Sequence, residues 1–237
     1  MLYELRMYQV AAGRMDDVVT RMRDHMPPLF DKHGFPQPLG QWRAVAGSRL
    51  PLYVWLLAWP DSEARAAAFG SLYADQEWAA VRQRTGGSRP PILNYDVLLM
   101  HAAPAWEAAR RLPGAGIGPT AGLHELRIYE LHPGRLPQMN RALAEVDLPV
   151  LHRGGGSTLG VFDIQSGWKL QAFAHFVAWP DYDTRRAAVE AHERDPAVLA
   201  QRGQEVAEIN TQQIVRHDSW LLEPAEYGLP NAGFASA

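Results

Sequence analysis

The chain contains no cysteine, which excludes disulfide bonds, thiolate nucleophiles and metals held by cysteine. It also lacks an excess of either charge, since 23 Lys and Arg stand against 26 Asp and Glu and the formal net charge is −3. No basic stripe with interleaved aromatic residues is present, so nucleic acid is not an expected partner. These absences leave a small molecule or another protein as the class of partner to look for.

Long hydrophobic runs are also missing. No window approaches the roughly 20 apolar residues that a membrane span requires, and the first residues have neither a basic segment nor an apolar signal-like core. We therefore expect no membrane span and a cytoplasmic location. The length of 237 residues accommodates one large domain or two of average size.

Several motifs of catalysis and cofactor binding do not occur. The sequence has no GxSxG elbow and no GxGxxG fingerprint, and its nine histidines include no HxxxH or HExxH spacing. The stretch RGGGST at 153–158 precedes an expected strand, so it lacks the helix N-terminus that a phosphate cradle uses. We expect no metal and no tightly bound cofactor.

What the sequence does contain is an internal repeat. Residues 2–15 (LYELRMYQVAAGRM) and 123–136 (LHELRIYELHPGRL) are identical at seven of 14 positions, where unrelated sequences would share about one. The stretch AWPD at 58–61 returns at 178–181 with nearly the same offset. Two copies favour a duplicated domain over a solenoid. The predicted organisation is a first repeat (1–104), a linker with one helical turn (105–122), a second repeat (123–224) and a tail (225–237).

Each copy predicts the order strand, helix, strand, strand, helix, strand, which is the ferredoxin-like βαββαβ arrangement. Pro27 and Pro149 predict the ends of the first helices, and Asp61 and Asp181 predict N-caps of the later ones. One four-stranded sheet covers only one face with its helices. The predicted fold class is therefore α+β, with two repeats closing their bare faces into one intrachain barrel. The expected strands are 2–10, 39–45, 52–59, 92–100, 123–131, 159–164, 172–179 and 212–222.

The first strands carry charges in alternation. Residues two apart in a strand share a face, so Glu4, Arg6 and Tyr8 point one way. The second copy repeats this set as Glu125, Arg127 and Tyr129. We place the polar face in the space between the sheets and the apolar face under the helices. Two interpretations stay open: the charges pair to tie strands together, or an arginine holds an anionic or enolate oxygen while tyrosine donates a hydrogen bond.

The third strands differ between the copies. Tyr53, Trp55 and Trp59 share one face of the first, while the second has His175 in place of Trp55 and keeps Trp179. Histidine has an unperturbed pKa of roughly 6.5, which suits proton transfer near neutral pH. A histidine that is simply hydrogen-bonded into the sheet is the alternative.

These stretches, together with LHRGGGSTLGVFDIQSG and AFAHFVAWPD, resemble the NIPSNAP family, whose members are similar to the wider dimeric α+β barrel superfamily. The resemblance covers both halves and is closer in the second; the first departs from it at Trp55 and in GFPQPLG. It implies a site in a cavity between the sheets. The superfamily includes cofactor-free monooxygenases, polyketide cyclases, lactone isomerases and haem-binding enzymes, so the fold alone does not select a reaction.

The sequence thus predicts a small-molecule enzyme: a cofactor-independent isomerase, cyclase or oxygenase for an aromatic or polyketide-like substrate. The alternatives are a non-catalytic ligand-binding or protein-interaction module and, through His175, a haem site. Whether the chain forms a homo-oligomer stays open. The predicted catalytic residues are His175, Arg127, Tyr129 and Glu125, and the predicted substrate-binding residues are Glu4, Arg6, Tyr8, Tyr53, Trp55, Trp59 and Trp179.

Overall fold

A computed structural model describes residues 1–115, 122–167 and 170–225. The first repeat comprises β1 (Leu2–Val10), α1 (Met15–Thr20), the π-helical segment η1 (Arg21–His25), α2 (Met26–His33), β2 (Gly40–Ala46), β3 (Leu52–Trp59), α3 (Ser62–Ala74), α4 (Gln76–Gly86) and β4 (Ile92–Ala102). After α5 (Pro104–Ala109), the second comprises β5 (Leu123–Leu131), α6 (Leu136–Ala142), the π-helical segment η2 (Leu143–Asp147), α7 (Leu148–Arg153), β6 (Ser157–Ser166), β7 (Ala172–Trp179), α8 (Tyr182–Arg194), α9 (Pro196–Ile209) and β8 (Ile214–Pro224).

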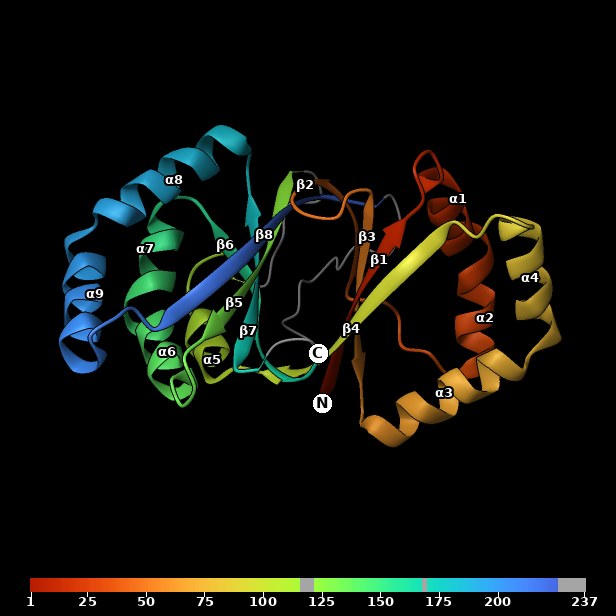
Figure 1. The fold of residues 1–237 in the computed structure, drawn as a ribbon, viewed down its shortest axis with the longest axis horizontal. Coiled ribbons are helices and arrows are strands. Elements are labelled where there is room, and N and C mark those ends of the chain that lie inside the picture. Colours follow the sequence, from red (N-terminus) through yellow and green to blue (C-terminus); the bar gives the residue numbers. More distant parts are fainter. Residues whose placement is uncertain (116–121, 168–169, 226–237) are drawn as a thin grey trace.

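The eight strands close into one antiparallel barrel in the order β1-β3-β2-β8-β5-β7-β6-β4. The first strand of each repeat lies between the third and fourth strands of the same repeat, and the β2–β8 and β4–β6 pairs join the repeats. Helices α1–α4 cover one side of the barrel and α6–α9 the opposite side (Figure 1). This confirms the predicted α+β barrel built from two ferredoxin-like repeats.

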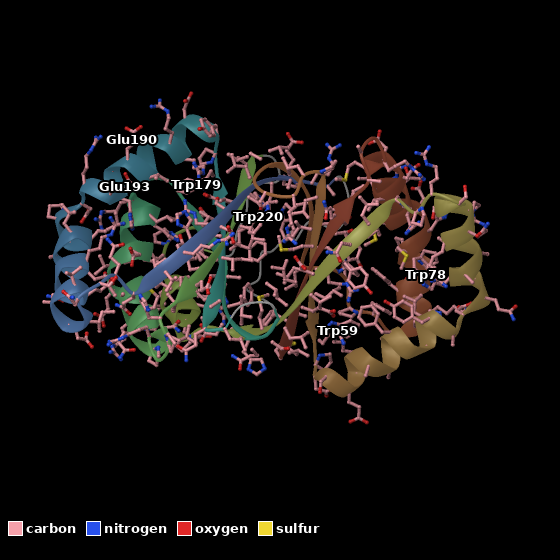
Figure 2. All side chains as sticks on the ribbon, viewed as in Figure 1. Trp59, Trp78, Trp179, Glu190, Glu193 and Trp220 are labelled. Atoms are coloured by element: carbon pink, nitrogen blue, oxygen red, sulfur yellow. The ribbon has the colours of Figure 1, made fainter. Side chains whose placement is uncertain are left out.

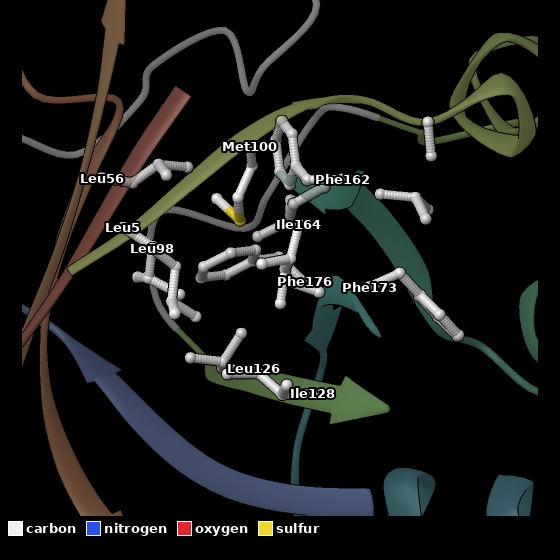
Figure 3. Close-up of a cluster of buried hydrophobic side chains, with 14 of the residues drawn as sticks. Leu5, Leu56, Leu98, Met100, Leu126, Ile128, Phe162, Ile164, Phe173 and Phe176 are labelled. Carbon is white, nitrogen blue, oxygen red and sulfur yellow. The ribbon is translucent and has the colours of Figure 1, made fainter. Parts of the chain in front are cut away.

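The interior of the barrel is an apolar core, which corrects the predicted direction of the strand faces. The apolar side chains of the first strands meet there and are at most 2% exposed (Figure 3). They are Leu5, Met7, Leu126 and Ile128. The ring centroids of Tyr3 and Phe162 lie 4.6 Å apart across the two repeats. The space between the sheets is therefore filled core, and the polar faces of β1 and β5 point to the helices.

The prediction about the faces was wrong because strand alternation shows only which residues share a face. In this barrel both faces of each sheet are covered, one by the other sheet and one by helices. A closed barrel of eight strands has an interior just wide enough for side chains to fill it, and apolar side chains fill it without needing partners. The charged face obtains its partners from the helices: Arg65 of α3 donates to Glu4 at 2.7 Å, and Arg185 of α8 donates to Glu125 at 2.6 Å.

The two prolines of the first helices do not end them, which corrects another expectation. Pro27 and Pro149 lie in the first turns of α2 and α7, and each helix follows directly on a π-helical segment. Proline has no N–H and its ring collides with the carbonyl one turn back, so the widened π turn accommodates it and the helix restarts at the position where proline fits. The predicted caps are confirmed, since Asp61 and Asp181 each accept a hydrogen bond from a backbone N–H of α3 and α8.

The predicted linker contains a helix that packs against the second repeat. Helix α5 buries Trp106 to 1% exposure and packs against the apolar core. The rest of the linker, 116–121, and the tail from 226 lie outside the described residues. The predicted repeat boundaries stay a prediction. Among the described residues, no helix combines the length and apolar character needed to cross a bilayer.

Candidate functional site

The second repeat contains a cavity of about 320 Å³ between its sheet and its helices. Its volume lies at the lower end of the roughly 300–1,000 Å³ of small-molecule sites. Strands β5 and β7 supply the floor, with Arg127, Tyr129 and His175, and the helices supply an apolar wall that includes Leu148 and Val189. Of the predicted site residues, the structure brings Glu125, Arg127, Tyr129, His175 and Trp179 together in this cavity.

The matching layer of the first repeat is filled with aromatic side chains. Trp55 is 3% exposed and stacks on Phe30 with ring centroids 5.8 Å apart. The guanidinium of Arg6 lies 4.7 Å from the ring centre of Phe69, and it also donates to Glu4 at 2.6 Å. Arg6 is therefore enclosed by its own repeat.

The remaining predicted substrate-binding residues lie apart from the cavity. Trp59 donates to Glu4 at 2.8 Å, and Tyr53 donates to Gln41 at 2.5 Å, both within the first repeat. Figure 2 shows Trp59 and Trp179 in their separate repeats on either side of the barrel. The prediction that both halves contribute to one shared pocket is corrected, because the filled barrel interior separates them. The residues concerned are Glu4, Arg6, Tyr8, Tyr53, Trp55 and Trp59.

Smaller side chains at matched positions account for the cavity in the second repeat. The strand registers pair Arg6 with Trp55 and Arg127 with His175. Protein interiors pack closely, so an aromatic ring that is replaced by a smaller group without refilling leaves a space. Two first-repeat rings with smaller counterparts that line the cavity are Trp55 and Phe69, matched by His175 and Val189.

Glu125 anchors the floor of the cavity. Its fully buried carboxylate accepts hydrogen bonds from Arg127 at 2.8 Å, from Arg185 at 2.6 and 3.0 Å, from Trp179 at 3.0 Å and from Ser219 at 2.6 Å. Burial by itself raises the pKa of Glu125, but the charge of Arg127 and the bonds from Arg185, Arg127 and Ser219 outweigh it and hold the pKa at about 2. The carboxylate is therefore charged at neutral pH and holds its neighbours in place rather than exchanging protons.

The floor has more positive than negative charge. Arg127 and Arg185 share the single carboxylate of Glu125, which leaves one positive charge uncompensated there. Burial opposes the charged form of Arg127, yet Tyr129 and Glu125 raise its pKa overall, so it stays a cation. Apart from Glu125, the acidic side chains of the lining come from the helical wall, namely Asp147, Glu193 and Glu205. The floor therefore favours an anionic oxygen.

Tyr129 supplies a hydrogen-bond donor beside this charge. Its ring stacks on Phe173, with centroids 4.7 Å apart. Burial raises the pKa of Tyr129 against the lowering effect of Arg127, so the phenol keeps its proton. A protonated phenol next to a guanidinium is an arrangement that stabilises negative charge on a ligand oxygen.

His175 differs from its predicted behaviour. It is 2% exposed, and burial, followed by the charge of Arg127, lowers its pKa to about 3. Its imidazole is therefore neutral at physiological pH. The expected proton transfer near neutrality does not suit this histidine, because the surroundings that bury it also disfavour its protonated form.

Several residues of the site were not predicted from the sequence. Arg185 had a signal, since it stands four residues after Asp181 as Arg65 does after Asp61. His192 and Asp147 line the cavity from the helical wall, with Nε2 and Oδ1 2.9 Å apart. They had no signal, because they lie 45 residues apart on different helical segments. Within the described residues, no group of three or more His, Asp or Glu is placed to hold a metal ion.

Comparison with known proteins identifies the family. A family model described as NIPSNAP matches residues 3–88 and 124–228, one match in each repeat. The chain belongs to the NIPSNAP family. No match was found among curated proteins.

Solved structures share the fold of this NIPSNAP protein at low sequence identity. A candidate monooxygenase from Lactobacillus acidophilus NCFM is 8% identical with a TM-score of 0.58, covering 98% of this chain and 97% of that one. A candidate monooxygenase from Fusobacterium nucleatum is 11% identical with a TM-score of 0.55, covering 95% and 92%. Chlorite dismutase from Candidatus Nitrospira defluvii is 6% identical with a TM-score of 0.57, covering 96% and 93%. At these identities the similarity shows the barrel fold alone, and the reaction has to be inferred from the residues of the site.

The cavity of this NIPSNAP protein does not fit a haem held by His175. The positive charge of Arg127 lowers the pKa of His175 and in the same way opposes a metal cation on that ring. The ring also gives its Nε2 to a contact of 3.2 Å with Thr158.

Proposed function

We propose that this NIPSNAP protein is a small-molecule enzyme whose site is the cavity of the second repeat. Its reaction class is a cofactor-independent isomerisation, cyclisation or oxygenation of an aromatic or polyketide-like compound. The observation that supports the proposal is the contrast between the repeats. Both contain the same Glu–Arg–Tyr set, but aromatic rings cover Arg6, whereas the side chains around Arg127 leave about 320 Å³ open. Packing alone gives no reason for that space.

The charges of the cavity orient the ligand. An anionic or enolate oxygen binds at Arg127, where the floor has its uncompensated positive charge, and Tyr129 donates a hydrogen bond to the same oxygen. The carbon body of the ligand packs on the apolar wall, which includes Leu143, Leu148 and Val189. This places the polar end of the ligand at the sheet and its apolar end at the helices.

The group that transfers the proton lies on the helical wall of the cavity. We assign the base to His192, because it lines the cavity, is partly exposed, and its Nε2 lies 2.9 Å from Oδ1 of Asp147. In an isomerisation, His192 takes a proton from the carbon next to a ligand carbonyl. The electrons of the broken C–H bond move to the carbonyl oxygen, which becomes an enolate beside Arg127, and the proton then returns to a different ligand atom.

The test uses phenylpyruvate, an aromatic anion with an exchangeable C–H next to its carbonyl. NMR measures the rate at which that hydrogen exchanges in D₂O. We expect the wild type to accelerate exchange, and we expect His192→Ala and Arg127→Met to lose most of the acceleration. The control is Trp55→Phe in the first repeat, which leaves the cavity untouched. Exchange no faster than in buffer, combined with the capture of no compound from a metabolite extract in native mass spectrometry, would overturn the proposal.

The alternative is a non-catalytic ligand-binding or protein-interaction module. One observation favours it: Glu4, in the aromatic-filled layer of the first repeat, is held by Arg6, Arg65 and Trp59 much as Glu125 is held in the cavity. The polar set therefore stabilises a repeat without a ligand. Binding of phenylpyruvate without faster exchange would favour this reading.

A further inference from the structure

A chain of hydrogen bonds leads from the surface to the histidine of the cavity. Nε2 of His152 on α7 lies 3.0 Å from the hydroxyl oxygen of Thr158 on β6, and that oxygen lies 3.2 Å from Nε2 of His175 on β7. Thr158 is fully buried and His175 is 2% exposed. The partners of each atom determine where the protons lie.

The proton of His152 is located by two independent contacts. Its Nδ1 lies 3.3 Å from the carbonyl oxygen of Pro113, which can only accept, so Nδ1 carries the hydrogen. The backbone N–H of Thr158 donates to the other ring nitrogen, Nε2, at 3.1 Å, so that nitrogen carries a lone pair. Both contacts require the same neutral form of His152.

The orientation of the threonine hydroxyl follows from this. Its oxygen lies 3.0 Å from the lone pair of His152, and two lone pairs at that distance would repel, so the hydroxyl hydrogen points to His152. The hydroxyl oxygen is then free to accept, and the 3.2 Å contact is a hydrogen bond donated by Nε2 of His175. His175 therefore carries a proton on Nε2, and because burial and Arg127 lower the pKa of its imidazole and keep the ring neutral, Nδ1 carries a lone pair.

His175 lies beside the positive floor of the cavity. His175 stands directly opposite Arg127 in the pairing of β5 with β7, and both side chains line the cavity. Among the described residues, the hydrogen bond of His175 is made through Nε2, and Nδ1 makes none. A ligand at Arg127 thus meets a neutral nitrogen acceptor next to a cation.

We infer that Thr158 and His152 are positioning residues that lock His175 in its Nε2–H form, so that the cavity binds a hydroxy acid with its carboxylate at Arg127 and its adjacent hydroxyl donating to Nδ1 of His175. The ligand class rests on the proposed function, whereas the proton on Nε2 of His175 rests on the hydrogen bonds. The sister repeat has Trp55 at the position of His175 and, with Pro27 aligned on Pro149, Phe30 at that of His152. Those two rings stack, so this hydrogen-bonded chain belongs to the cavity repeat.

NMR of protein labelled with ¹⁵N in histidine tests the proton positions directly. The His175 signal, assigned by its loss in His175→Phe, should show the proton on Nε2. Thr158→Val keeps the shape of threonine and removes the hydroxyl, so the signal should become a mixture of both forms, and Thr158→Ser should restore the wild-type pattern. A wild-type proton on Nδ1, or an unchanged pattern in a folded Thr158→Val, would overturn the inference. If Thr158→Val does not fold, the wild-type spectrum alone decides.

Titration calorimetry with three probes tests the ligand class. Mandelate has a hydroxyl beside its carboxylate, α-methoxyphenylacetate has that oxygen without the hydrogen, and phenylacetate lacks it. We expect mandelate to bind up to about tenfold more tightly than the methoxy compound, the effect of one hydrogen bond. Thr158→Val should remove this preference and leave phenylacetate binding unchanged.

The outcomes separate the two proposals. Equal binding of mandelate and the methoxy compound would refute the hydroxy-acid assignment while leaving an anion site at Arg127 in place. If none of the three probes binds, the hydroxy-acid assignment fails, and the exchange experiment with phenylpyruvate decides the proposed cavity function separately. The NMR result still decides the proton positions in that case.

Discussion

Replacement of Glu125 by glutamine tests the electrostatic anchor of the cavity. The folded pKa of Glu125 is about 2, against an ordinary value of 4.5. A difference of about 2.5 units at about 1.36 kcal/mol per unit corresponds to about 3 kcal/mol of stability that depends on the charge of this carboxylate. Breaking a buried ion pair by removing one partner costs a similar amount, about 3–5 kcal/mol, because the guanidinium groups stay buried.

The pH dependence has a defined direction. Because the folded pKa lies below 4.5, this stabilisation is complete above about pH 5 and is lost as the pH falls toward 2. Urea unfolding followed by tryptophan fluorescence, repeated from pH 7 to pH 3, measures it. The free energy of unfolding of Glu125→Gln should be about 3 kcal/mol below that of the wild type at pH 7, and the two should converge as the pH falls.

A matched control separates this effect from the loss of any surface charge. Asp183 faces Arg186 at 3.6 Å on the exposed side of α8, with side-chain exposures of 86% and 57%. Surface pairs contribute about 0–1 kcal/mol, so Asp183→Asn should leave the unfolding curve nearly unchanged. A Glu125→Gln protein as stable as the wild type at pH 7, or a difference that stays constant down to pH 3, would refute the reasoning.

The remaining predictions concern the histidine, the cavity and the caps. The pKa of His175 is lowered to about 3, so the stability that its neutral state contributes above pH 6.5 is lost as the pH falls toward 3. The free energy of unfolding of His175→Gln should therefore decline less steeply across that range than that of the wild type. Parallel curves for the two proteins would contradict the lowered pKa. The pair His175→Trp and Val189→Phe copies the filled repeat, and calorimetry with phenylacetate should show no binding; retained binding would place the ligand elsewhere. Trp55→His should cost about 3 kcal/mol in urea unfolding, since it opens a void in a packed layer, and a cost below about 1 kcal/mol would show that the layer is loosely packed. Asp61→Ala and Asp181→Ala each remove an N-cap and should each cost about 1 kcal/mol, with a loss in only one repeat arguing against equivalent caps.

Much of the fold was determined by the sequence itself. The internal repeat, the first strands at 2–10 and 123–131 and the third strands at 52–59 and 172–179 agree with the structure to the residue. The N-caps at Asp61 and Asp181 were also predicted correctly. Alternation, helix periodicity and capping act over a few neighbouring residues, so they can be recognised without knowing the rest of the chain.

Only the tertiary structure decided where the site lies and how its groups behave. Alternation grouped Glu125, Arg127 and Tyr129 on one face, but closure of the barrel turned that face to the helices and filled the interior with Leu126 and its neighbours. The pKa of His175 depends on burial and on Arg127 across the strand pair, and the partners of Glu125 arrive from 60 and 94 residues away. Packing and electrostatics act through space, so distant residues determine the cavity, its charge and its protonation states.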